Sequence, residues 1–211
     1  MTGATDSMAL ATDERRDLAD LLDSLTPDQW ATPSLCAGWS VRDVVAHILS
    51  YEELGWIGVA GAFARGWLRP RRVNDIRLGA YRNQTPEELR ALLRAHLTPR
   101  GLTAGFGGGI ALTDCVIHHQ DIRRPLRLPR SVPADRLERA LSLAMTAPTL
   151  PGRRNSRGLS IVPTDLDWRA GNGAEVTGPG EALLLSLAGR PAALDDLAGP
   201  GAQLLRRRVA R

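Results

Sequence analysis

The feature that constrains this chain most is the run of residues 110–121, where two histidines and two carboxylates interrupt an otherwise apolar sequence. If the run is helical, Asp114, His118 and Asp121 share one face, because they stand at positions i, i+4 and i+7. A helix that is apolar on nearly every other side is a buried helix. Its acidic and imidazole groups must therefore be paired, hydrogen-bonded or bound to a metal ion.

Three further segments have the apolar spacing of amphipathic helices, at about residues 8–25, 41–63 and 86–98. Two of them begin with capping sequences, which start at Ser40 and Thr85. Together with the helix that Pro125 should end, they predict a mainly α protein with a four-helix bundle. We place the bundle domain at residues 8–147, a range that also includes a fifth helix from residue 134.

The last part of the chain, residues 150–211, predicts a small C-terminal α+β region. Short strands are expected at 159–162 and 174–177, and the sequence Gly171-Asn172-Gly173 predicts a hairpin turn. An apolar helix at 179–188 and a short helix at 192–197 should complete this region.

The composition, 43% apolar and 24% charged over 211 residues, is that of an ordinary globular protein. Every basic residue is arginine, which indicates genomic G+C bias more simply than nucleic-acid binding. Two cysteines favour free thiols in a reducing cytosol over a disulfide framework. No stretch is apolar enough for a spanning helix, and none is typical of a signal peptide. We expect a cytoplasmic monomer or homodimer with no nucleic-acid or membrane partner.

His47, on another predicted helix, gives the 110–121 run a possible partner. His47, Asp114 and His118 offer two nitrogens and one oxygen, and three protein ligands with an open position are typical of a catalytic zinc site. Asp121 either orients a metal-bound imidazole or pairs with a neighbouring arginine, and the sequence leaves both open.

The remaining histidines and the cysteines are assigned structural roles. His119 should lie on the surface or pack against another helix, and His96 should lie on the surface. Cys115 is expected in the core, and Cys36 in the core or at its rim. The sequence contains no nucleophile elbow, phosphate loop or dinucleotide fingerprint, so we assign no nucleophile to the chain.

Two segments near the N-terminus have a distinctive sequence: residues 25–30 read Leu-Thr-Pro-Asp-Gln-Trp, and residues 33–47 read Pro-Ser-Leu-Cys-Ala-Gly-Trp-Ser-Val-Arg-Asp-Val-Val-Ala-His. They resemble the N-terminal signature of the mycothiol-dependent maleylpyruvate isomerase family. That family is part of the DinB/YfiT-like superfamily. Residues 114–121 resemble its second signature, usually Glu-x-x-x-His-x-x-Asp, and parts of 165–191 resemble the C-terminal region of many members.

The resemblance implies a DinB/YfiT-like four-helix bundle that binds a divalent metal, usually zinc, and the thiol cofactor mycothiol. The metal ligands would be His47, Asp114 and His118. Asp114 stands where the family usually has glutamate, and its side chain is one methylene shorter, which reduces its reach across the bundle.

These observations favour a mycothiol-dependent metalloenzyme that adds a thiol to a small electrophilic substrate, as an isomerase or an S-transferase. Arg82 or Arg190 would bind a substrate carboxylate. One alternative is a metal-dependent hydrolase on the same bundle, with Asp121 or Asp43 as its base. Another is a non-catalytic DinB-like protein that binds a metal or ligand. The substrate and the reaction stay open, as does metal occupancy.

Overall fold

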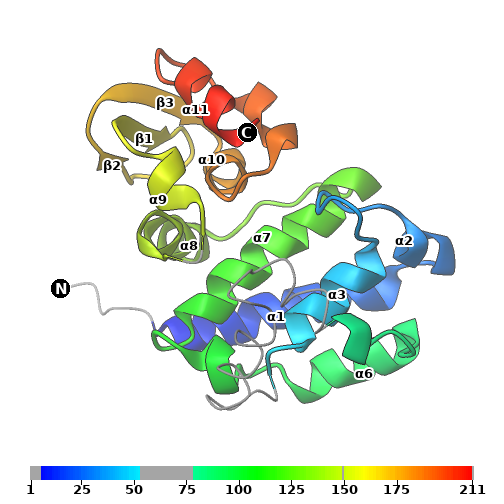
Figure 1. Cartoon of the computed structure of the whole chain (residues 1–211). Coiled ribbons are helices and arrows are strands. Elements are labelled where there is room, and N and C mark those ends of the chain that lie inside the picture. The colour runs from blue at the N-terminus through cyan, green and yellow to red at the C-terminus, as the bar shows by residue number, and fades with distance from the viewer. Residues whose placement is uncertain (1–5, 53–77, 149, 211) are drawn as a thin grey trace. The chain divides into compact units, whose positions relative to one another are not determined.

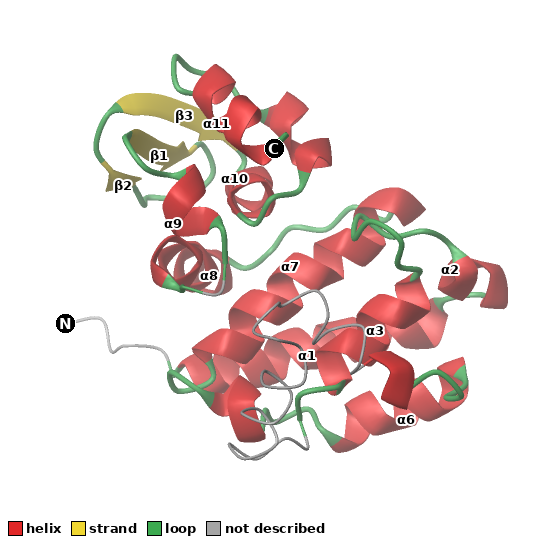
Figure 2. Cartoon of the chain, in the orientation of Figure 1, coloured by secondary structure: helices red, strands yellow, loops and turns green. Residues whose placement is uncertain are grey.

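The computed structural model describes residues 6–52, 78–148 and 150–210. The chain forms two compact units, Met1–Pro129 and Arg130–Arg211. The described residues are mainly helical, with one small sheet in the second unit (Figure 2). This confirms the predicted fold class, a mainly α protein with a small C-terminal α+β region.

Where the structure describes it, the first unit contains four main helices. These are α1 (Ser7–Ser24), α3 (Val41–Leu49), α6 (Pro86–Ala95) and α7 (Gly109–Leu126), with a short α2 (Pro27–Ala31) and a 3-10 turn η1 (Gly101–Ala104) between them. Helix α7 packs along α1 and also contacts α3, while α6 packs against α1 and α3 (Figure 1). Side chains on α3 and α7 can therefore meet.

Capping sequences set where three of these helices begin. The Ser40 hydroxyl accepts from the backbone N–H of Asp43, whose carboxylate accepts from the Ser40 N–H, and Thr85 caps α6 in the same way. Both predicted capping boxes are confirmed, and Thr26 forms a third one at α2. The start of α3 is thus fixed nearly two turns before His47.

Leucine and valine side chains from α1, α3 and α6 form the core of the first unit against α7. Its fully buried members include Leu18, Leu22, Val44, Val45, Leu89, Leu93, Cys115 and Ile122. Burial of each such leucine or valine contributes about 1.5–3 kcal/mol. Helix α7 is buried along most of its length, as its composition predicts.

Two helix ends differ from the sequence-based prediction. Pro125 lies inside the last turn of α7, and the helix ends only where Arg127 adopts a left-handed conformation with φ 56°. The predicted helix 41–63 is helical from Val41 to Leu49. Residues 53–63 of that prediction lie outside the described residues.

The second unit combines helices with a three-stranded sheet. It contains α8 (Ala134–Thr146), α9 (Gly152–Asn155), β1 (Leu159–Pro163), β2 (Ala170–Gly171), β3 (Ala174–Gly178), α10 (Gly180–Leu187), η2 (Pro191–Asp196) and α11 (Ala202–Val209). Strand β1 is central, antiparallel to β2 and parallel to β3. Helix α10, buried along its whole length, packs against α8 and β1.

The predicted hairpin at residues 171–173 is wrong, because the two expected strands, β1 and β3, pair parallel, whereas a hairpin joins antiparallel strands. The glycines serve another purpose. Gly173 has a φ of 130°, and a Cβ there would lie 2.2 Å from the carbonyl oxygen of Gly158. The chain thus needs glycine here to pass close to the start of β1.

The boundary between the two units lies at residues 129–130, whereas the sequence places it between 147 and 150. Helix α8 explains the difference, because its buried residues Leu137, Ala140 and Leu141 face elements of the second unit such as α10. Within the described parts of the chain, no helix has both the length and the apolarity needed to cross a membrane.

Candidate metal centre

Helices α3 and α7 bring the three predicted metal ligands together. The Nε2 atom of His118 lies 3.4 Å from Oδ1 of Asp114, and Nε2 of His47 lies 3.8 Å from the same oxygen. His47 and His118 are buried, and their ring centroids are 4.9 Å apart. One carboxylate oxygen and two ring nitrogens, from two helices, therefore converge on one point.

These donors fit a divalent metal. All three candidate ligand atoms lie within 4.8 Å of one another. Ligand atoms held 2.0–2.2 Å from a tetrahedral zinc ion are roughly 3.3–3.6 Å apart, so the two separations from Oδ1 of Asp114, 3.4 and 3.8 Å, are close to those of a zinc site. The aspartate at position 114 thus has sufficient reach. Its side chain is 35% exposed, so the centre is open on that side.

Asp121 lies behind His118, on the far side from Asp114. Its Oδ2 accepts a hydrogen bond from Nδ1 of His118 at 2.9 Å, and the carboxylate is fully buried. A proton on Nδ1 leaves Nε2 as the nitrogen that faces Asp114 and His47. Of the two roles that the sequence leaves open for Asp121, the structure shows the contact with the imidazole.

The electrostatics of the cluster couple Asp114 to the imidazoles. Burial alone would raise the pKa of Asp114, but the charge and hydrogen bond of His118, and then His47, hold it well below its usual range. Burial opposes the charged form of His118, yet Asp114, Asp121 and Cys36 raise the pKa of this imidazole well above its ordinary value. A metal ion at Nε2 must therefore displace a well-held proton.

The loop between α2 and α3 reaches both sides of the centre. Its Trp39 indole lies against His47, with ring centroids 5.0 Å apart, and the Sγ of Cys36 lies 3.1 Å from Oδ2 of Asp121. The loop is pinned to α7 by a backbone hydrogen bond from Leu35 N–H to the Asp121 carbonyl. This loop thus contacts one proposed ligand, His47, directly, and it contacts Asp121, the hydrogen-bond partner of the other, His118.

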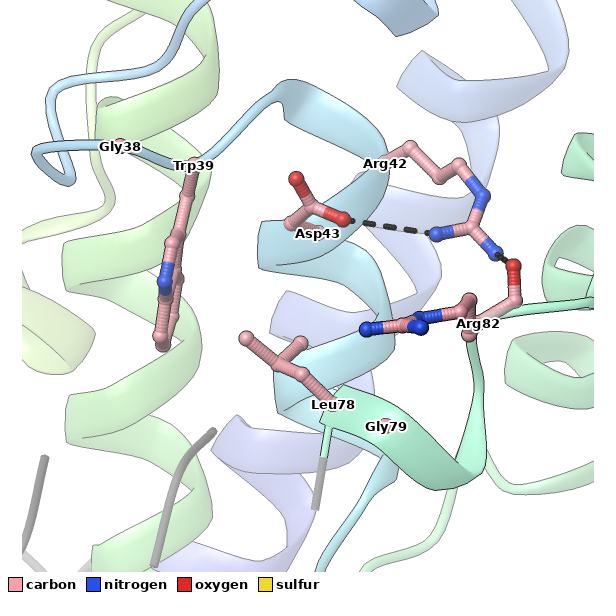
Figure 3. A pocket seen from close by; sticks show the side chains of 7 residues that line it. All are labelled: Gly38, Trp39, Arg42, Asp43, Leu78, Gly79 and Arg82. Atoms are coloured by element: carbon pink, nitrogen blue, oxygen red, sulfur yellow. Dashed lines mark hydrogen bonds and ion pairs between the residues drawn. The ribbon is translucent and has the colours of Figure 1, made fainter. Parts of the chain in front are cut away.

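Beside Trp39 lies a cavity of about 300 Å³, which the residues drawn in Figure 3 line. Arg42, at its wall, donates to the carbonyl oxygens of Tyr81, Arg82 and Gln84 and to Oδ1 of Asp43. The Arg82 guanidinium extends toward Leu78 in Figure 3 and forms no ion pair with the described residues. The predicted candidate Arg82 therefore lies at a pocket that shares Trp39 with the metal centre.

The second predicted arginine, Arg190, belongs to the second unit. Its Nη1 donates to the carbonyl oxygen of Ala188 at 2.9 Å. It thus takes part in the local structure after α10, and its relation to the metal centre stays a prediction.

The neighbouring histidines have structural contacts. His119 is fully buried and donates through Nδ1 to Glu14 of α1, while its Nε2 accepts from Arg123. Of the two positions left open for it, packing against another helix is the one observed. His96 is half-buried at the end of α6, where its carbonyl accepts from Arg15.

Sequence reasoning missed two features next to the centre, Cys36 beside Asp121 and Trp39 against His47. Both lie in the 33–47 block that carries the family resemblance, which was the available signal. It also missed Glu14 and Arg15, which are buried on α1. They stand four and three positions before Leu18 and so share its helix face. This spacing was the signal that could have predicted their burial.

Comparisons with known proteins found a sequence match and similar solved structures. Residues 11–100 match the sequence model of the mycothiol maleylpyruvate isomerase N-terminal domain. The crystal structure of the mycothiol-dependent maleylpyruvate isomerase is similar, with a TM-score of 0.56 at 15% identity, over 94% of this chain and 93% of that one. A histidine-to-alanine mutant of an enzyme of that name gives 0.55 at 14%, with the same coverage.

No curated protein sequence matches the chain. At such low identities the structural likeness establishes the fold, and the sequence match adds a likeness to the family's N-terminal domain over residues 11–100. The chain therefore has the fold of the mycothiol-dependent maleylpyruvate isomerase, and its residues 11–100 are similar to the N-terminal domain of the mycothiol maleylpyruvate isomerase family.

Proposed function

We propose that the protein is a mycothiol-dependent metalloenzyme that adds a thiol to a small electrophilic substrate, as an isomerase or S-transferase. The observation that carries this proposal is the convergence of His47, Asp114 and His118 within 4.8 Å on two facing helices. Mycothiol enters because the matched family and the similar solved enzyme are named for it.

The residues of the chain would divide the work as follows. His47, Asp114 and His118 would hold a divalent metal, zinc being the ion that such a set of nitrogen and oxygen ligands suits. When bound, the metal lowers the pKa of a thiol that coordinates it. Asp121 holds the His118 ring in the orientation that presents Nε2, and the Trp39 indole limits the movement of His47. The exposed side of Asp114 leaves the approach for the thiol.

Arg82 would bind an anionic group of the substrate in the neighbouring pocket. Among the described residues that line this pocket, Asp43 is the only carboxylate, and it is occupied by Ser40 and Arg42. The charge of Arg82 is therefore left for a ligand, and its guanidinium suits a carboxylate. A substrate anchored there would lie beside Trp39, which the pocket and the metal centre share.

The hydrolase alternative gains little support from the geometry. A hydrolase needs a general base beside the metal. Asp121 already accepts hydrogen bonds from His118 and Cys36 behind the centre, and Asp43 is committed to the capping box.

The test of this function combines metal analysis with turnover. Untagged protein is expected to bind one zinc ion per chain and to isomerise or conjugate small unsaturated acids only when mycothiol is supplied. Asp20→Asn, at an exposed carboxylate of α1, serves as the control and should leave zinc binding and turnover unchanged. Turnover without any thiol would favour a hydrolase, and zinc and mycothiol binding without turnover would favour a binding protein.

Replacement of Arg82 by glutamine tests the pocket. We expect KM for an anionic substrate to rise about 10-fold or more, with kcat little changed, because a lost charge-assisted hydrogen bond is worth about 1.5–3 kcal/mol. The matched control is an uncharged ester of the same substrate, for which Arg82→Gln should have no effect. An equal loss with both compounds would show that Arg82 does not recognise the charge.

A further inference from the structure

We propose that Cys36 is a positioning residue for the metal centre, acting through Asp121 on His118. Its thiol donates to the same carboxylate oxygen, Oδ2 of Asp121, that accepts the His118 Nδ1–H. This inference rests on the proposed metal site. The Cys36 thiol lies outside the set of three ligands. It belongs to a loop, whereas the ligands belong to helices α3 and α7.

His118 stands between two sets of groups. Its Nε2 faces Asp114 and His47, and its Nδ1 faces Asp121 and Cys36. Hydrogen bonds to the second ring nitrogen of a ligating histidine fix its tautomer and orientation. What determines the position of the Asp121 carboxylate therefore also determines where Nε2 points.

Asp121 is held from two directions by consecutive residues of the loop. The Cys36 thiol contacts its carboxylate at 3.1 Å, and the Leu35 N–H donates to its backbone carbonyl at 3.1 Å. A fully buried carboxylate needs such donors, because burying the charge without hydrogen bonds is costly. The thiol therefore gives Oδ2 of Asp121 a second donor beside His118, which limits rotation of the carboxylate.

The loop is itself rigid enough to position a thiol. The Ser34 hydroxyl donates to the carbonyl of Trp39 and accepts from the Cys36 N–H at 3.1 Å, and the Trp39 N–H donates to the Cys36 carbonyl. Gly38 supplies the left-handed conformation, with φ 81°, that closes this turn. The position of Cys36 is thus determined by the loop as well as by Asp121.

Cys36, His118 and Asp121 also lie close enough together to hold a metal among themselves. Two contacts favour the positioning role instead. The 2.9 Å bond between His118 and Asp121 and the 3.1 Å bond from the thiol both require protons on Nδ1 and Sγ, and a metal at this point would replace both. His118 and Asp114 meanwhile converge with His47 on the other side of the ring.

The first experiment measures zinc affinity by competition with a chromophoric chelator. We expect Cys36→Ala to weaken zinc binding about 10-fold, the lower end of the 10–100-fold range for partners of a ligating histidine. Cys36→Ser, which keeps a donor, should restore affinity to within about 3-fold, and Asp121→Asn should lose about 10–100-fold. Cys115→Ser, at a buried thiol outside the centre, is the matched control and should leave affinity unchanged.

The second experiment needs no substitution at Cys36. In Cys115→Ser protein the single thiol is Cys36, and its infrared S–H stretching band should be shifted to lower wavenumber by the bond to Asp121. Asp121→Asn should reduce that shift. Loaded with Co²⁺, the protein should show d–d bands that Cys36→Ala perturbs, and no thiolate-to-cobalt charge-transfer band.

Three results would overturn the proposal. Unchanged zinc affinity in Cys36→Ala would show that the thiol does not act through Asp121. A thiolate charge-transfer band in the Co²⁺ protein, with loss of the S–H band, would make Cys36 a ligand instead. If the wild-type protein bound no zinc at all, the proposed function would itself fail, a result that is distinct from the other two.

Discussion

Replacement of His118 by asparagine is expected to weaken zinc binding by more than about 100-fold, because loss of a ligand should exceed the 10–100-fold cost of losing a ligand's hydrogen-bond partner. Asparagine keeps a side-chain N–H where Nδ1 of histidine lies, so the bond to the buried Asp121 can persist. We therefore expect a small change in the free energy of unfolding of the metal-free protein. Equilibrium dialysis and urea denaturation measure the two quantities.

The same substitution at the next residue, His119→Asn, is expected to have the opposite profile. Here the side-chain N–H facing Glu14 can be retained, but the Nε2 that accepts from Arg123 is lost. A buried donor left without its acceptor costs about 1–3 kcal/mol, so the free energy of unfolding should fall by that amount while zinc affinity stays within a few-fold. If His119→Asn lost zinc and His118→Asn kept it, the assignment of ligands would be wrong.

Glu52→Ala is expected to be the most destabilising single change in the first unit, by about 3–5 kcal/mol, because it removes one partner of a buried ion pair. Glu52 pairs with Arg15 of α1, and both side chains are 1% exposed. It also accepts from the Thr103 hydroxyl at 2.6 Å and from the Arg100 N–H at 3.0 Å. The Glu52 carboxylate, which follows α3 in the chain, thus connects that segment to both α1 and η1.

The control for Glu52 is an ion pair at the surface. Asp20→Asn removes one of the two carboxylates that contact Arg94 at 2.6 Å, and these side chains are exposed. Exposed ion pairs contribute about 0.2–1 kcal/mol to stability, so the free energy of unfolding of this variant should lie within about 1 kcal/mol of the wild-type value. If urea denaturation gave Glu52→Ala and Asp20→Asn similar losses, the buried network would not stabilise the unit as argued.

Local patterns predicted most of the bundle. The capping sequences at Ser40 and Thr85 and the apolar stripes fixed where α3 and α6 begin, because both depend on residues within one or two turns. The hairpin at 171–173 failed for the opposite reason. Strand β3 pairs with β1 as predicted, but it runs parallel to it, and a local turn signal carries no information about the path of the chain between strands about 15 positions apart.

The part of the candidate centre that lies within one helix could be predicted from the sequence. Asp114 and His118 follow from helical spacing, but the convergence of His47 required the packing of α3 on α7. The contacts of Cys36 and Trp39 depend on the folding of a loop, which has no periodicity to read. The burial of Glu14 and Arg15 contradicts their polarity and follows only from their place on α1.

The central claim is that a divalent metal binds between His47, Asp114 and His118. An anomalous difference map from crystals of zinc-supplemented protein, recorded on both sides of the zinc absorption edge, tests it most directly. We predict one peak within coordination distance of His47 Nε2, Asp114 Oδ1 and His118 Nε2. A map with no such peak, or with the peak between Cys36, His118 and Asp121, would contradict the claim.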